Sequence, residues 1–137
     1  MRLNVHLNFS GQCEEAFERY RGILGGKISI MMTYGESPMA NQVGAEWQKK
    51  IMHVSLETED QTLMGADVPP DRYQKPQGFD IAVRVSDPAE AERVFKALVE
   101  GGVVQMPLQE TFWSHRFGML VDRYGIPWMV NCGKTSS

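Results

Sequence analysis

Residues 110–134 read ETFWSHRFGMLVDRYGIPWMVNCGK, and this stretch decides the fold. Apolar and polar residues alternate along it, with the period of two that is typical of a half-buried strand. Tyr124-Gly125 interrupts the alternation, and the pattern resumes at Trp128. The stretch therefore predicts two strands joined by a tight turn. It also contains more aromatic and polar side chains than a plain hairpin needs: Trp113, His115, Arg116, Asp122, Trp128 and Asn131.

The same order of elements occurs twice along the chain. In each half an alternating strand leads into an amphipathic helix, which ends at a Gly-Gly pair. The segments Ser10 to Gly26 and Ser86 to Gly102 have equal length. We therefore expect the strand, the helix and the terminating Gly-Gly pair to occur at the same spacing in both halves. The predicted helices cover about Gln12 to Leu24 and about 88–99, and the predicted strands are Leu3 to Phe9, Lys27 to Tyr34, Ile51 to Thr58, Gln61 to Ala66, 80–85, Val103 to Leu108, Arg116 to Asp122 and Trp128 to Cys132.

These elements predict an α+β domain built from two βαβββ modules. A chain of 137 residues fits one domain, so we expect two repeats, about 1–68 and 78–134, joined by a linker at 69–77. A second loop, residues 35–48, is long for a connection and contains Glu36, Met39 and Trp47. It is either a mobile flap over a site or an exposed excursion without a role.

Composition and charge restrict the class of partner. The net charge of −3 and the pI near 5.6 favour neither nucleic acid nor an anionic membrane. No apolar run approaches the roughly 20 residues that span a bilayer, and no signal-peptide pattern opens the chain. Cys13 and Cys132 lie far apart, and Cys13 falls on the apolar side of the first helix. We therefore expect a cytoplasmic protein in which Cys13 is a small buried hydrophobe.

The closing segment resembles that of the PhnB-like proteins, a branch of the vicinal-oxygen-chelate superfamily that includes glyoxalase I and bleomycin-resistance proteins. The resemblance rests on Glu-Thr-Phe-Trp at 110–113, the following His, Phe-Gly and Asp, the aromatic-Gly turn and Pro-Trp-Met at 127–129. Residues 9–16 and 20–25 add to it. It implies curved mixed sheets with a concave pocket, and a homodimer with a two-fold interface.

In metal-using members of the superfamily, His, Glu or Gln side chains bind a divalent metal on the concave faces. The resemblance places His6 at the first ligand position and Asp80, within a residue or two, at its counterpart in the second repeat. The last strand has Met129 where such members have Glu, and its counterpart is near Met64. Because thioethers are poor ligands for Mg²⁺, Mn²⁺ and Zn²⁺, this set predicts a broken metal site. His53 could restore it, or it could be an ordinary histidine.

His115 lies inside the best family match and has three interpretations. It is a candidate general acid or base, a donor that orients a ligand, or the polar partner of Trp113. Arg116 could clamp a carboxylate or phosphate, but an ion pair with Glu110 or Asp122 across the sheet is favoured over that role. Asp122 is expected to stabilise the turn that follows it through local hydrogen bonds.

The predicted ligand-binding residues describe a half-apolar cup for a small, oxygen-bearing or partly aromatic molecule. They are His6, Asn8, Arg84, Trp113, His115, Met129 and Asn131. Three functions remain open. The first is a metal-independent small-molecule-binding protein, which the incomplete ligand set favours. The second is a metal-dependent lyase, isomerase or dioxygenase of glyoxalase type, using His6, Asp80 or His53 and a third group from the paired chain. The third is a housekeeping dimer whose pocket binds nothing specific.

Overall fold

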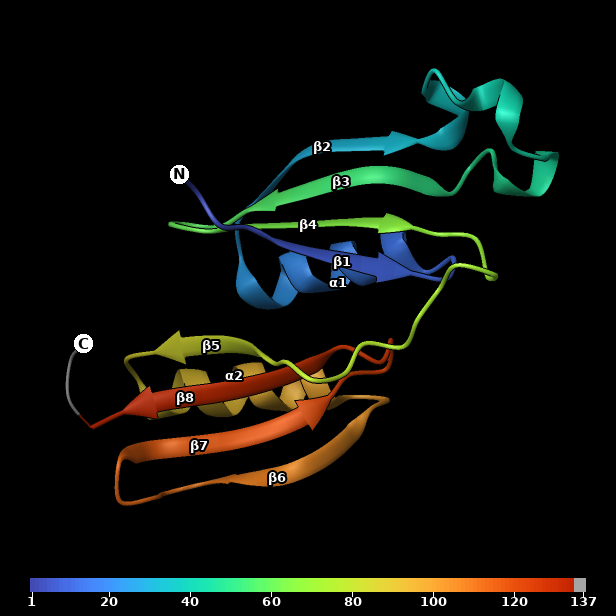
Figure 1. Cartoon of the computed structure of the whole chain (residues 1–137). Coiled ribbons are helices and arrows are strands. Elements are labelled where there is room, and N and C mark those ends of the chain that lie inside the picture. Colours follow the sequence, from blue (N-terminus) through green and yellow to red (C-terminus); the bar gives the residue numbers. More distant parts are fainter. Residues whose placement is uncertain (135–137) are drawn as a thin grey trace. The chain divides into compact units, whose positions relative to one another are not determined.

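The computed structural model of the protein describes residues 1–134 (Figure 1). The chain divides into two compact units between Gln74 and Lys75, named module 1 and module 2 below. Within residues 1–134 each module has one long helix and one four-stranded sheet. The boundary falls inside the segment predicted as a linker.

Module 1 contains the elements β1 (Val5–Phe9), α1 (Cys13–Leu24), β2 (Lys27–Thr33), β3 (Ile51–Glu57) and β4 (Thr62–Asp67). Module 2 contains β5 (Ile81–Val85), α2 (Pro88–Val99), β6 (Val103–Gln109), β7 (Ser114–Val121) and β8 (Pro127–Gly133). The strand orders are β1-β4-β3-β2 and β5-β8-β7-β6, so the two sheets share one topology. In each sheet the first strand pairs parallel with the last, and the other pairs are antiparallel. The predicted α+β architecture of two βαβββ modules is confirmed.

The helix of each module covers one face of its sheet (Figure 1). In module 1, Leu7 and Phe9 of β1 turn to that face and are almost fully buried. The rings of Phe9 and Phe17 meet edge to face with centroids 6.0 Å apart. Gly65 of β4 lets the Phe17 ring approach the sheet, because a Cβ at position 65 would lie 2.5 Å from that ring. An absent side chain on β4 thus makes room for a helix aromatic.

Module 2 builds its core around the strand that the opening stretch predicted. Trp128, Val130 and Cys132 alternate along β8 and are at most 1 % exposed. Phe95 of α2 packs over Gly118, where a Cβ would lie 2.7 Å from the ring. The hairpin turn is confirmed at Gly125, whose φ of 88° is a conformation that favours glycine.

The two helices are not in the register that equal spacing predicted. β1 and β5 are both five residues long, but α1 begins after three connecting residues and α2 after two. The extra residue in module 1 accompanies Gly11, whose φ is 109°. The expected register is therefore wrong by one residue, because turn geometry sets the start of each helix.

The loop between β2 and β3 is held by internal contacts. It forms three short 3-10 turns, Tyr34–Glu36, Ala40–Gln42 and Ala45–Trp47. The Gln48 side-chain amide donates to the carbonyl oxygens of Ala40 and Val43. The loop thus has its own hydrogen-bonded framework, and a role as a flap stays a prediction.

Candidate functional site

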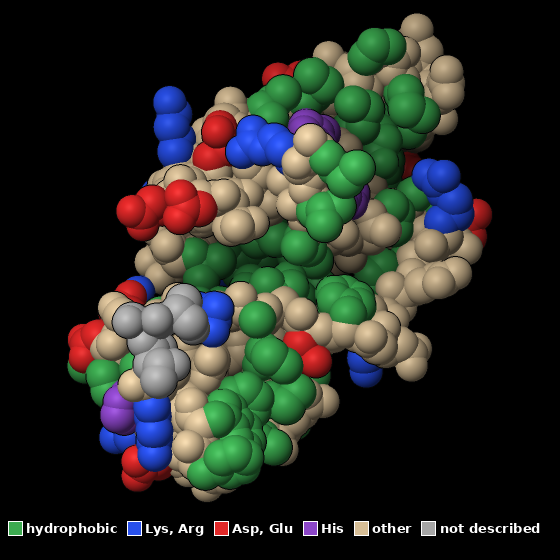
Figure 2. Space-filling view, turned by 60° about the vertical axis from the view of Figure 1, so that its left-hand side comes forward, with side chains coloured by type: hydrophobic (Ala, Val, Ile, Leu, Met, Phe, Trp, Pro, Cys, Tyr) green, Lys and Arg blue, Asp and Glu red, His purple; other side chains and the backbone are tan. Residues whose placement is uncertain are grey.

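Most of the candidate site residues lie on the sheet face opposite the helix, named the helix-distal face of each module. Side chains alternate along a strand, so the neighbours of the buried Leu7 and Val130 point to this face. In module 1 the face carries His6, Asn8, His53, Ser55, Met64 and Ala66. In module 2 it carries Ala82, Arg84, Phe117, Met119, Met129 and Asn131. Hydrophobic side chains also reach the surface in both modules (Figure 2).

In module 1 the strand register brings two imidazoles towards one thioether. His6 is the Cα partner of Met64 on the neighbouring strand, and Met64 is in turn the partner of Ser55. His53 lies two residues before Ser55, on the same face. Desolvation lowers the pKa of His6, and the nearby His53 lowers it further. The two histidines are therefore close enough to interact electrostatically.

In module 2 the corresponding face joins a guanidinium, an amide and aromatic rings. Arg84 is the Cα partner of Asn131, which is the partner of Phe117. The rings of Trp113 and Phe117 meet edge to face with centroids 5.7 Å apart. Arg84, Asn131 and Phe117 thus form one row across three strands, with Trp113 at its end. The sequence indicated Arg84, Trp113 and Asn131 but not Phe117, which alternation beside Gly118 could have placed.

Asn131 is oriented by the buried hydroxyl of Ser114. The Ser114 Oγ lies within hydrogen-bond reach of the Asn131 amide and of the carbonyl oxygens of Arg116 and Cys132. The Ser114 hydroxyl donates to the Asn131 Oδ1, with the two carbonyl oxygens as alternative acceptors of the same proton. The amide NH₂ of Asn131 is then left as a donor for other groups.

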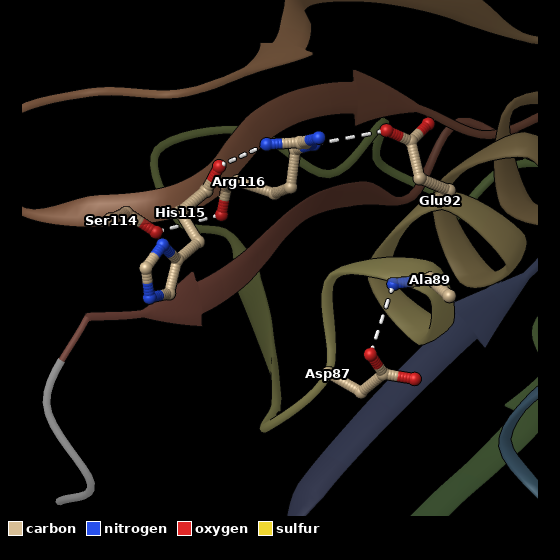
Figure 3. Close-up of polar contacts among 6 residues, drawn as sticks. All are labelled: Asp87, Ala89, Glu92, Ser114, His115 and Arg116. Atoms are coloured by element: carbon tan, nitrogen blue, oxygen red, sulfur yellow. Dashed lines mark hydrogen bonds and ion pairs between the residues drawn. The ribbon is translucent and has the colours of Figure 1, made fainter.

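The neighbouring residues His115 and Arg116 of β7 differ in their side-chain contacts (Figure 3). The Arg116 Nε donates to the Glu92 carboxylate of α2 at 3.0 Å, and its Nη1 donates to the carbonyl oxygen of His115. The predicted ion pair with Glu110 or Asp122 is wrong, because Arg116 pairs with Cys132 in register and so turns to the helix side. The His115 imidazole takes part in none of the contacts drawn in Figure 3 and is exposed.

Asp80 does not occupy the position that mirrors His6. His6 pairs with Met64 and Ala82 pairs with Met129, so the register makes Ala82 the counterpart of His6. Asp80 precedes β5 and is exposed. The correspondence of Met64 with Met129, by contrast, follows from the same register. Within residues 1–134, no group of three or more His, Cys, Asp or Glu side chains is placed to hold a metal ion.

Two buried carboxylates support this framework, and one of them was missed. Asp67 lies just beyond the predicted strand Gln61 to Ala66, but it ends β4, where its carboxylate accepts from the backbone N–H groups of Gly11, Cys13 and Ile51 at 2.9–3.0 Å. Asp122 accepts from the backbone N–H groups of Tyr124 and Ile126 and from Trp128 Nε1. The predicted turn role of Asp122 is confirmed, whereas no local pattern signals Asp67.

Both cysteines are free and buried in the described structure. The Cys13 thiol is fully buried, and burial, then Asp67, raises its pKa. This agrees with the prediction of a small buried hydrophobe. No helix within residues 1–134 has the length and apolar character that crossing a membrane requires.

The comparison with known families agrees with this geometry. The family profile described as 3-demethylubiquinone-9 3-methyltransferase matches residues 2–131. The chain belongs to this PhnB-like family. Protein YjdN of Escherichia coli K12 is 31% identical, over 98% of this chain and 97% of that protein.

Solved structures show which fold the PhnB-like chain shares. Protein PA1353 of Pseudomonas aeruginosa is 44% identical with a TM-score of 0.85, over 96% of this chain and 98% of that one. A Bacillus cereus PhnB protein, described as a 3-demethylubiquinone-9 3-methyltransferase, is 24% identical with a TM-score of 0.83, over 97% and 100%. A glyoxylase/bleomycin resistance protein/dioxygenase domain from Frankia is 12% identical with a TM-score of 0.65, over 98% of each chain. The last two show a shared fold, which is the glyoxalase/bleomycin-resistance fold.

Proposed function

We propose that this PhnB-like protein binds a small organic molecule without a catalytic divalent metal. The observation that carries the proposal is the placement of Met64 and Met129. They occupy equivalent positions on the last strand of each module, on the helix-distal face. Metal-using relatives are expected to have a carboxylate there, and a thioether is a poor ligand for hard divalent ions. The side chains of this face therefore do not fit such a metal, and the proposed function does not depend on one.

The helix-distal face of module 2 supplies the groups that an organic ligand needs. Arg84 can pair with a carboxylate or another oxyanion, and the Asn131 amide NH₂ can donate a hydrogen bond to a ligand oxygen. The rings of Trp113 and Phe117 and the thioether of Met129 provide an apolar surface. This combination supports a small, partly aromatic ligand that carries oxygen atoms.

The methyltransferase named in the family description is not part of the proposal. Such an enzyme binds S-adenosylmethionine, usually at a Gly-rich turn between a strand and a helix N-terminus. Here the turn before α1 is closed by the Asp67 carboxylate, and α2 is capped by Asp87. Both helix N-termini are already satisfied by negatively charged side chains of the protein.

A second candidate function, a metal-dependent lyase, isomerase or dioxygenase, is favoured by one observation. His6 and His53 interact electrostatically on one face, as two of the ligands of a divalent metal would. Among residues 1–134, no third His, Cys, Asp or Glu side chain accompanies them in a group that could hold a metal ion. This function would therefore need a ligand from a second chain or from the substrate.

Thermal unfolding of EDTA-treated protein distinguishes the two functions. The titration uses Zn²⁺, Mn²⁺, Ni²⁺, Co²⁺ and Fe²⁺, with His6→Ala as the matched variant. The proposed function predicts no metal-specific rise in melting temperature. A rise that His6→Ala abolishes would instead support the enzyme.

A ligand screen then tests the binding face directly. Small aromatic carboxylates, dicarbonyls and catechols are added to the metal-free protein, because a ligand of the folded state stabilises it by about 2.7 kcal/mol at a hundred times its Kd. We expect the stabilisation by a hit to disappear in Arg84→Ala and Asn131→Ala. Arg93→Ala, on the surface of α2 and paired with Glu90, is the control. Hits that persist unchanged in both face variants would contradict the assignment.

Two further proposals concern assembly and location. The superfamily resemblance supports a homodimer, which analytical ultracentrifugation at micromolar concentration tests directly. A mass of one chain would exclude it. The two free thiols are consistent with a reducing compartment, so we also propose a cytoplasmic location.

A further inference from the structure

An unassigned cluster lies on the helix-distal face of module 1, where two imidazoles flank a thioether. We propose that His6, Met64 and His53 form a binding site for monovalent copper. The proposal goes beyond the small-molecule function, since it needs no organic ligand and uses a different module. In this proposal Met64 is a copper ligand, at the position where a site for a hard divalent ion would need a carboxylate.

The strand register places the side chains of His6, Met64 and His53 next to one another on one face of the sheet. His6 and Met64 are Cα partners on adjacent parallel strands, which lie about 4.8 Å apart. His53 is diagonal to Met64 across the β3–β4 pair, at a Cα separation of about 7–8 Å. All three side chains point to the same face, so the central thioether has an imidazole on each side.

The surroundings leave this cluster accessible. His6 is exposed, while His53 and Met64 are half-buried. Ala66, the next residue on this face of β4, contributes only a methyl group and is the Cα partner of Asn8 on β1. A second thioether is adjacent, because Met32 of β2 is the Cα partner of His53. An ion could therefore reach the cluster from the side of Ala66 and find up to four donors.

The donor chemistry selects a soft ion. Thioethers favour Cu(I) over hard and borderline divalent ions, and imidazole is a good copper ligand as well. The nearest carboxylate on this face of β3 is Glu57, four residues from His53 and about 13 Å away along the strand. Mg²⁺, Mn²⁺ and Ca²⁺, which require oxygen ligands, are not served by this set.

Module 2 provides an internal control for the proposal. The positions that correspond to His6, Met64 and His53 are Ala82, Met129 and Phe117. The thioether is present there, but both imidazoles are replaced by side chains that cannot coordinate a metal. The register therefore assigns copper to module 1 alone, with one ion per chain.

The experiment is an anaerobic competition of the full-length protein with a coloured Cu(I) chelator, bicinchoninate. We expect one Cu(I) per chain, with the affinity reduced at least tenfold in Met64→Leu and in His53→Phe, which copies the module 2 residue. Met129→Leu should bind as the unchanged protein does. Absence of binding, or binding that Met64→Leu leaves unchanged, would overturn the proposal. The second outcome would place the ion at residues outside this cluster.

A second measurement locates the ion without relying on affinity. Ag(I) is a diamagnetic substitute for Cu(I), and ¹³C-methyl-methionine spectra report each thioether separately. We expect one equivalent of Ag(I) to shift the Met64 methyl resonance and leave that of Met129 in place, each assigned by its Leu variant. Equal shifts at both methyl groups would contradict a site built by the histidines. Failure of either test leaves the organic-ligand screen unaffected, because that screen depends on Arg84 and Asn131.

Discussion

The two modules begin their helices in different ways. In module 2, Asp87 lies directly before α2 and its side chain accepts from the Ala89 backbone N–H, followed by Pro88 in the first turn. In module 1 the residue before α1 is Gln12, which makes no side-chain capping bond. Asp67 replaces it from the end of β4, 54 residues away from Cys13. The backbone N–H groups at the helix N-terminus are thus bonded by a local side chain in module 2 and by a tertiary contact in module 1.

This difference shows that a shared topology does not require shared polar anchors. Phe9 pairs with Asp67 in module 1, whereas Val85 pairs with Cys132 in module 2, so a cysteine occupies the place of the anchoring carboxylate. Module 2 buries its carboxylate elsewhere, at Asp122 in the β7–β8 turn. Each module therefore has one buried Asp that joins segments, at opposite ends of equivalent strands.

Replacing Asp67 should have the largest effect on stability. In Asp67→Ala three backbone N–H groups lose their acceptor, at a cost of about 1–3 kcal/mol for each donor left unsatisfied. Asp67→Asn retains one acceptor oxygen and should lose less. The free energy of unfolding in urea measures both changes. A loss below about 1 kcal/mol in Asp67→Ala would show that water replaces the carboxylate.

The local cap in module 2 should matter less than its tertiary counterpart. Asp87 is exposed and makes one capping bond of 3.3 Å, so Asp87→Ala should cost about 0.5–1 kcal/mol. The same urea titration provides the comparison. If Asp67→Ala and Asp87→Ala lowered the free energy of unfolding equally, the tertiary cap would be no more stabilising than the local one.

The close approach of helix to sheet should make two glycines sensitive in both modules. A Cβ at Gly65 or Gly118 would overlap the ring of Phe17 or Phe95, so each Ala variant should lose about 1–3 kcal/mol. Gly22→Ala on α1 is the control, because nothing lies within 4 Å of its Cβ and alanine favours a helix. It should gain up to about 1 kcal/mol. A neutral Gly65→Ala would mean that the Phe17 ring moves aside easily.

The smallest expected effect is a pH dependence in module 1. Desolvation and then His53 hold the pKa of His6 below its ordinary value, so the unfolded chain binds this proton more tightly. The contribution of His6 to stability is complete above its unfolded pKa of about 6.5 and falls as the pH drops through the window below it. NMR titration of the metal-free protein should show the pKa of His6 rising in His53→Gln. His115→Gln, in the other module, should leave it unchanged.

Much of the fold follows from local pattern. Alternation predicted the strands of both sheets and the β7–β8 turn at Gly125, and the apolar spacing of residues before each Gly-Gly pair predicted the two helices. The helix-distal position of Met129 and Asn131 follows in the same way, because strand side chains alternate with a period of two. These features depend on neighbours within a few residues, which is why the sequence by itself determined them.

Other features depended on which strands pair and in what register. The sequence placed Asp67 in a loop, mirrored His6 with Asp80, and paired Arg116 within the sheet. The structure turns Asp67 to the start of α1, puts Ala82 opposite Met129, and joins Arg116 to Glu92. Only the tertiary structure decided these contacts, and with them the grouping of His6, Met64 and His53, because they join residues far apart in the chain. A local pattern specifies which face a side chain takes, while the strand register specifies what it meets there.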